Sequence, residues 1–182
     1  MKKKMILILA SAVLVLAIGV GGTLAYLTAQ STVTNTFSIG NVALTLEETG
    51  ATFSDGVGSK AYANVVPGQT VTKDPKVTVT SGSEDCYLFV EVVKNDPTSL
   101  LIYTSNLTEA NGWAAVSAGD RVVFSREVLK GATPRAFELI KDNEIKMSTD
   151  LTNGSTIPSL AFKAYAVQKL GLTAAEAWAE VD

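Results

Sequence analysis

Apolar and polar residues alternate along much of the chain, which is the pattern of a half-buried β-strand. The alternation is clearest at residues 77–80, 86–92 and 162–167. Turn signals separate such segments, among them Asp55-Gly56 and Pro67-Gly68, the latter in the order that a type II turn requires. Many short strands between turns predict an all-β fold, an antiparallel two-sheet sandwich. A jelly roll is the member of that class that suits this length.

Three segments depart from simple alternation. The phase of the apolar positions shifts at Gly40-Asn41, which predicts a β-bulge or tight bend. Residues 137–147 fit either a short helix or two short strands. Near the end, Thr173 and Glu176 have the spacing of an N-cap residue and its capping-box partner, so a short C-terminal helix is expected to begin there.

The first 25 residues have the pattern of a secretory signal peptide. Three lysines, Lys2 to Lys4, precede a long uncharged apolar run that ends in small residues. Thr23 and Ala25 occupy the −3 and −1 positions of a cut before Tyr26. The alternative is an uncleaved anchor, because the run approaches the roughly 20 residues that a membrane span needs. We expect cleavage after Ala25, and contact with the membrane only before cleavage.

The predicted organisation therefore has three parts. Residues 1–25 form a cleaved signal peptide, residues 26–37 an N-terminal extended segment, and residues 38–182 the jelly-roll domain. Loss of three lysines from the 15 basic residues leaves 12 against 18 acidic ones, a net charge of −6. Such a balance, with scattered basic residues, argues against binding of nucleic acid.

The chain has no histidine and one cysteine. The absence of histidine excludes an HExxH zinc site, a Ser-His-Asp triad and a Cys-His dyad. Adjacent carboxylates remain at Glu47-Glu48, Glu84-Asp85 and Asp142 with Glu144, where we expect solvated surface charge. We therefore predict no catalytic residue, no metal site and no cofactor.

Cys86 alternates with Leu88, Val90 and Val92 on one face of a predicted strand. A lone cysteine cannot form an internal disulfide, so the stability of the domain must come from packing. We interpret Cys86 as a small apolar core residue rather than as a reactive thiol.

Three stretches resemble the TasA/camelysin family of Gram-positive bacteria. Residues 21–48, "GGTLAYLTAQSTVTNTFSIGNVALTLEE", resemble the end of the family's signal and the start of its mature chain, with Phe37, Gly40 and Leu44 at the matching positions. Residues 65–92, with their Pro-Gly turn and Lys-Asp pair, and residues 160–168, "LAFKAYAVQ", are similar to later strands of the family. The resemblance implies processing by a signal peptidase of the SipW type that recognises Thr23, Ala25 and Tyr26.

The resemblance also implies a secreted jelly-roll protein of the cell surface or biofilm matrix. TasA-like proteins form fibres by donor-strand exchange, so the implied partner is another copy of the chain or a related matrix protein. The donor strand would be the Thr/Ser-rich, strand-prone segment 26–37, with these candidate residues: Thr28, Ser31, Val33, Asn35 and Phe37. The alternative is that this segment pairs within its own domain as an ordinary edge strand.

Two other functions stay open at this point. Camelysin-like relatives are described as cell-surface metallopeptidases, although this chain offers no histidine ligand. A monomeric surface adhesin or ligand-binding sandwich would need exposed aromatic residues, for which Tyr103 and Trp113 are the candidates. Of these, we expect Trp113 to lie in the core or at its rim.

Overall fold

A computed structural model describes residues 41–54 and 57–181 of the chain. All the described residues belong to one compact unit, Gly40–Asp182. The predicted cleavage at Ala25, the donor segment 26–37, the bend at Gly40 and the turn at Asp55-Gly56 lie outside the described residues. Within the described ranges, no helix has both the length and the apolar character needed to span a bilayer.

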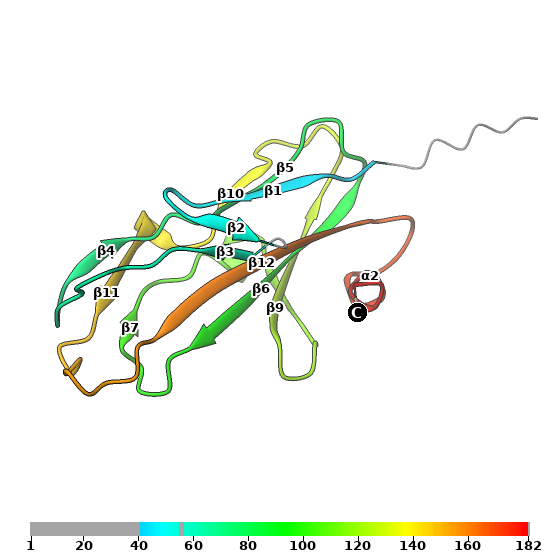
Figure 1. The fold of residues 1–182 in the computed structure, drawn as a ribbon. Helices are drawn as coiled ribbons and strands as arrows, with labels where there is room; N and C mark the ends of the chain where they lie inside the picture. The colour runs from blue at the N-terminus through cyan, green and yellow to red at the C-terminus, as the bar shows by residue number, and fades with distance from the viewer. Residues whose placement is uncertain (1–40, 55–56, 182) are drawn as a thin grey trace, which may run out of the picture. The chain divides into compact units, whose positions relative to one another are not determined.

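One layer of the domain is a four-stranded antiparallel sheet (Figure 1). Its strands, in spatial order, are β12 (Ser159–Gln168), β6 (Cys86–Asn95), β9 (Val122–Val128) and β8 (Ala114–Val116). β6 and β12 pair over their full ten residues, from Ser159 opposite Asn95 to Gln168 opposite Cys86. This ladder is the longest in the described structure, and it leaves β12 at the edge of the sheet.

The facing layer is built from two three-stranded antiparallel sheets. The first contains β1 (Leu44–Glu47), β5 (Lys76–Val79) and β10 (Ala136–Glu138). The second contains β4 (Thr70–Thr72), β11 (Glu144–Met147) and β7 (Leu101–Ile102). Backbone hydrogen bonds from Lys73 N to Asn143 O (2.8 Å) and from Leu139 N to Pro75 O (3.0 Å) carry the pairing from one sheet into the other.

The remaining elements are short. β2 (Thr52–Ser54) and β3 (Val57–Ser59) form a hairpin, and η1 (Glu109–Asn111) is a single turn of 3₁₀-helix. η2 (Lys141–Asn143) is an irregular turn, in which Asp142 has φ of 58° and Asn143 has φ of 56°. Segment 137–147, ambiguous in sequence, forms strands on either side of η2. At the Pro67-Gly68 turn, Gly68 has φ of 75° and Gln69 N donates to Val66 O at 3.1 Å, as a type II turn requires.

The predicted C-terminal helix is α2 (Ala174–Ala179). Both halves of the capping box are present: Glu176 N donates to Thr173 Oγ1 at 3.3 Å, and Thr173 N donates to Glu176 Oε2 at 2.8 Å. The all-β class with a short C-terminal helix is therefore confirmed, while the jelly-roll connectivity stays a prediction.

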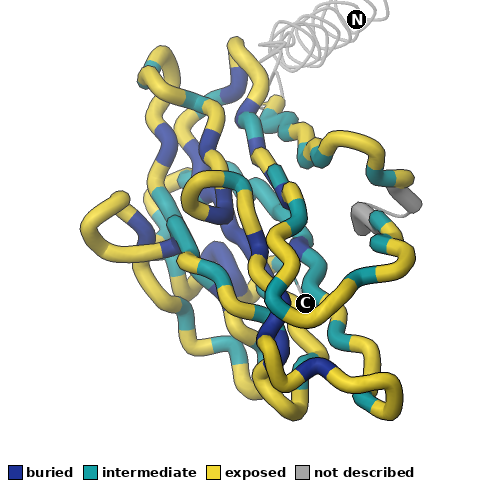
Figure 2. Tube along the Cα trace, turned by 90° about the vertical axis from the view of Figure 1, so that its left-hand side faces the viewer, coloured by how far each residue is buried: buried dark blue, intermediate teal, exposed yellow. Residues whose placement is uncertain are grey.

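The main core lies between the two layers. Val77 and Val79 of β5 meet Leu88 and Val90 of β6, all with no exposed surface. Figure 2 shows the buried segments gathered in the interior and the exposed segments in the loops around it. Cys86 is fully buried and free, and Trp113 is 3% exposed, so both predicted core positions are confirmed.

A second apolar cluster closes the outer face of the four-stranded sheet. Phe89 of β6 packs against Trp178 of α2, with ring centroids 5.2 Å apart. The Arg121 guanidinium lies 4.6 Å from the centre of the Trp178 ring and donates to the Glu91 carboxylate at 2.8 and 3.2 Å. These hydrogen bonds from Arg121 lower the pKa of Glu91, which keeps this buried carboxylate charged. Helix α2 is thus fixed to the sheet by both packing and charge.

Candidate functional site

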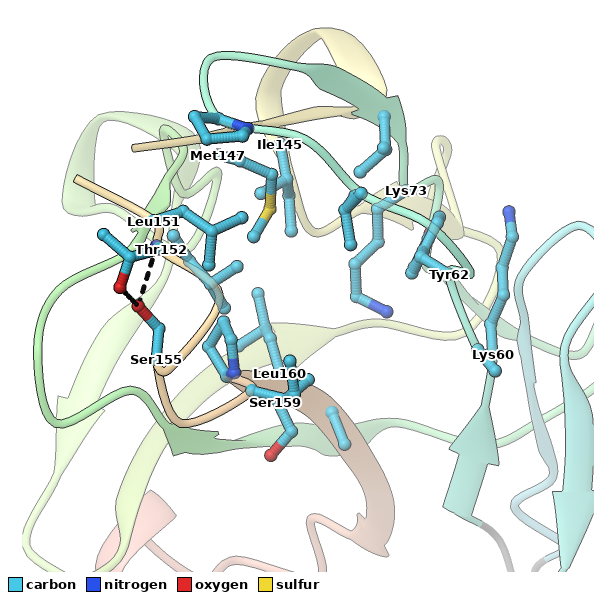
Figure 3. Close-up of a pocket in the computed structure, with 18 of the residues that line it drawn as sticks. Lys60, Tyr62, Lys73, Ile145, Met147, Leu151, Thr152, Ser155, Ser159 and Leu160 are labelled. Carbon is cyan, nitrogen blue, oxygen red and sulfur yellow. Dashed lines mark hydrogen bonds between the residues drawn. The ribbon is translucent and has the colours of Figure 1, made fainter. Parts of the chain in front are cut away.

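A groove of about 560 Å³ opens beside the edge of β12 (Figure 3). Its floor is the inner face of the sheet formed by β4, β11 and β7, and it is lined there by Val71, Leu101, Ile145 and Met147. Of the four-stranded sheet, only the start of β12 lines the groove, through residues 159–161. The groove exists because the four-stranded sheet ends at β12 whereas the facing layer continues to β4.

The edge of β12 that borders this groove has no strand partner in the described part of the chain. Lys169 N donates to Asp85 O at 2.8 Å, which continues the β6–β12 ladder by one position. Alternate residues of an antiparallel strand bond to the same neighbour, so the odd-numbered residues of β12 bond to β6. Leu160, Phe162 and Ala164 therefore direct their backbone N–H and C=O groups toward the open edge. β3 and β1 both lie close to β12, but among the described residues neither pairs with it.

A buried ion pair lies at one end of the groove. Lys73 Nζ donates to Glu48 Oε2 at 2.8 Å, and the two side chains are only 6% and 5% exposed. The expectation of solvated charge at Glu48 is therefore wrong. Glu48 comes directly after β1, and Lys73 comes directly after β4. The next residues along each segment are also bonded: Thr49 donates to the Asp74 carboxylate from its hydroxyl (2.6 Å) and from its backbone N–H (3.1 Å). These bonds hold the end of β1 against the end of β4.

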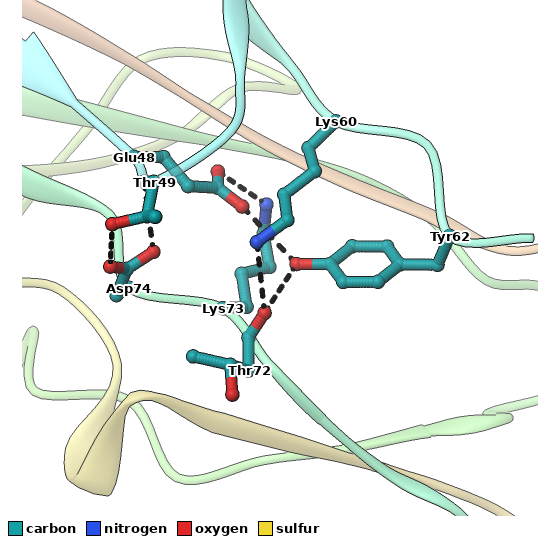
Figure 4. Close-up of polar contacts among 7 residues, drawn as sticks. All are labelled: Glu48, Thr49, Lys60, Tyr62, Thr72, Lys73 and Asp74. Atoms are coloured by element: carbon teal, nitrogen blue, oxygen red, sulfur yellow. Dashed lines mark hydrogen bonds and ion pairs between the residues drawn. The ribbon is translucent and has the colours of Figure 1, made fainter.

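Tyr62 connects this ion pair to the edge of β4 (Figure 4). Its hydroxyl donates to Thr72 O at 2.7 Å and lies 3.3 Å from Glu48 Oε1. Burial, and then the negative charge of Glu48, raise the pKa of Tyr62, so the hydroxyl stays a donor. Lys60 Nζ also donates to Thr72 O, at 3.3 Å, and lies 5.1 Å from the centre of the Tyr62 ring. The outward carbonyl of β4 is thus already satisfied by side chains.

The other predicted positions have ordinary structural surroundings. Glu84 accepts from Lys130 Nζ at 2.7 Å on the surface, and Asp142 and Glu144 are exposed, as expected. Tyr103 is partly buried against the core, so it and Trp113 do not form an exposed aromatic patch. The predicted signal-peptidase residues Thr23, Ala25 and Tyr26 and the predicted donor-strand residues lie outside the described residues.

The described residues do not fit a metal centre. Nowhere in ranges 41–54 and 57–181 do three or more His, Cys, Asp or Glu side chains gather in a way that could hold a metal ion. Glu48, the partner of the groove-lining Lys73, already accepts from Lys73 Nζ, and its other carboxylate oxygen lies 3.3 Å from the Tyr62 hydroxyl. The groove instead combines an apolar floor, an open strand edge and one buried cation, a combination suited to binding an extended chain.

Residues 1–88 match the family model described as "Camelysin metallo-endopeptidase". The predicted TasA/camelysin resemblance is confirmed. The match covers the signal-like start, segment 26–37 and the strands from β1 to the first part of β6. No curated protein and no solved structure matches the chain. The description of that family names a metallopeptidase, and the described side chains of this chain include no group of ligands for a metal ion.

The buried ion pair generates a test of how this end of the groove is stabilised. Lys73→Met leaves the Glu48 carboxylate buried without its cation, and we expect it to lower the free energy of unfolding by about 3–5 kcal/mol. The double variant Glu48→Leu/Lys73→Met removes both charges and should recover most of that loss. Chemical denaturation at neutral pH measures both effects.

The matched control is Lys130→Met, which breaks an ion pair whose side chains are 59% and 38% exposed. Its expected cost is about 1 kcal/mol or less, because solvent screens such pairs. Equal losses for Lys73→Met and Lys130→Met would contradict the assignment of the Glu48–Lys73 pair as a buried structural contact.

Proposed function

We propose that this chain is an exported structural protein of the cell surface or biofilm matrix that assembles into fibres. In each contact, the N-terminal segment 26–37 of one copy completes a sheet of the next copy by donor-strand exchange. The observation that carries the proposal is the apolar groove beside the open edge of β12, a place where the sandwich can take one more strand.

The physics of such a contact suits filament formation. A strand added to an open edge gains a ladder of main-chain hydrogen bonds, while pockets for alternate side chains supply selectivity. The donated segment precedes the domain in sequence and the groove lies within the domain, so the contact is head to tail. A head-to-tail contact that does not close into a ring repeats into a fibre.

Export and processing form the other half of the proposal. The signal-like start lies within the family match, and a signal peptidase of the SipW type would cut after Ala25, reading Thr23, Ala25 and Tyr26. Cleavage then places segment 26–37 at the new N-terminus, ahead of a jelly-roll domain. The producing cell would be a Gram-positive bacterium, and the product would be extracellular.

A second candidate function is a monomeric ligand-binding sandwich. The groove volume of about 560 Å³ lies within the range of pockets that hold small molecules. An occupant of that kind would fill the apolar floor but would leave the backbone groups of β12 without partners. A strand satisfies both features, which is why we prefer self-assembly.

Negative-stain electron microscopy of two purified proteins tests the proposal. A chain that begins at Tyr26 should form fibres, and a chain that begins at Phe37 should stay monomeric, because it lacks the donated segment. Matching thermal melts would show that both retain the folded domain. Fibres from both proteins would move the contact elsewhere, and monomers from both would favour the ligand-binding alternative.

A further inference from the structure

We infer that the donated strand binds along β12 with its odd-numbered side chains in the groove. A polar side chain of that face accepts a hydrogen bond from Lys73. This inference rests on the proposed function and adds the accepting edge, the face of the strand and its polar contact.

The choice of β12 follows from comparing the edge strands of the described sheets. β12 is ten residues long, whereas β8, at the opposite edge of the same sheet, has three residues; of the other edge strands, β1 has four, β10 three and β7 two. β4 has three, and its Thr72 carbonyl already accepts from Tyr62 and Lys60. Long open edges are the ones that attract another strand, and short or blocked edges resist it. Among these edges, β12 alone combines length, unpaired backbone groups and an adjacent groove.

The donated segment alternates between mostly apolar and mostly polar positions. Odd positions 27 to 37 read Leu, Ala, Ser, Val, Asn and Phe, whereas even positions 26 to 36 read Tyr, Thr, Gln, Thr, Thr and Thr. Successive side chains of a strand point to opposite faces, so all the apolar residues of positions 27–37 share one face. A strand placed beside β12 turns one face toward Val71, Ile145 and Met147 and the other toward solvent. The odd face suits the apolar floor, and the threonine face suits water.

Lys73 gives the groove a specific polar requirement. Its ammonium group has three N–H donors. Within the described part of the chain, Nζ donates one hydrogen bond, to Glu48, although the side chain is only 6% exposed. Figure 3 shows Nζ directed into the groove. Buried donors without acceptors are unfavourable, so an occupant that offers an oxygen at this point is favoured. The odd face offers Ser31 and Asn35, and we assign Asn35, whose side-chain amide oxygen extends farther from the backbone.

Cysteine cross-linking between two copies tests the edge. One preparation of the exported chain carries Val33→Cys and the other carries Leu160→Cys, which lies at the groove on β12; a control preparation carries Ala115→Cys on β8. Native Cys86 is fully buried and should not react. Under mild oxidation of mixed fibres, we expect a covalent dimer between Val33→Cys and Leu160→Cys, and none between Val33→Cys and Ala115→Cys. Two further preparations, Ser31→Cys and Asn35→Cys, are each mixed with Leu160→Cys. They detect a donated strand that is shifted by two residues along β12 in either direction.

The outcomes separate this inference from the proposed function. Fibres whose N-terminal cysteines link to β8, or to neither edge, would overturn the assignment of β12 and leave self-assembly intact. Failure of the unmodified chain to form fibres would overturn self-assembly itself, and the assignment with it.

A matched pair of substitutions tests the face and the contact with Lys73. Asn35→Leu removes the polar group from the odd face, and we expect it to raise the critical concentration for assembly about tenfold, the effect of leaving one buried donor without its acceptor. Thr34→Leu introduces the same side chain on the even face and should change that concentration little. Equal effects of the two variants, or a larger effect of Thr34→Leu, would overturn the assignment of the odd face.

Discussion

The ten-residue ladder between β6 and β12 is the constraint on which the rest of the structure depends. It fixes which backbone groups of β12 are satisfied and, by the alternation of an antiparallel strand, which are left at the open edge. It also fixes the two faces of β12. Phe162 points into the main core, while Tyr165 points to the cluster under α2. The groove, the open edge and the covered outer face are all consequences of where this ladder ends the sheet.

Two of the buried carboxylates, those of Glu91 and Glu48, have different roles around this ladder. Glu91 of β6 binds Arg121, whose guanidinium lies over Trp178, and this contact fixes α2 to the outer face of the sheet. Glu48 binds Lys73 at the end of the groove, and Tyr62 links that pair to the backbone of β4. Each carboxylate is compensated by a cation, as burial requires. The difference is that Lys73 has N–H donors besides the one bonded to Glu48. The ion pair at the groove is therefore the one that can take part in binding.

Local patterns predicted much of the fold. The strands β5, β6 and β12, the Pro67-Gly68 turn and the capping box of α2 all follow from residues that lie within a few positions of one another. The burial of Cys86 and Trp113 was also predictable, because it follows from apolar character and alternation. The choice between helix and strand at 137–147 was not, since its strands are fixed by pairing with β5, β4 and β7 rather than by local preference.

The site depends on contacts between distant segments, and sequence reasoning missed it for that reason. Glu48 and Lys73 are 25 positions apart and Glu91 and Arg121 are 30 apart, so nothing local marks Glu48 as buried. The groove depends on which strand ends the sheet, a property of the whole topology. Lys73 and Asp74 lie between two strands, where charged residues are common, so nothing in the sequence marked Lys73 as buried. The predicted residues from Thr23 to Phe37 stay predictions.

Residue-resolved amide hydrogen exchange, compared between monomer and fibre, tests the central claim most directly. In the monomer, the odd-numbered amides of β12 should be protected by β6, while the amides of Leu160, Phe162 and Ala164 exchange faster. On assembly, these three even-numbered amides should become protected, because the donated strand now accepts their hydrogen bonds. Fibres in which they exchange as fast as in the monomer, while amides of β8 or β1 gain protection, would contradict the account.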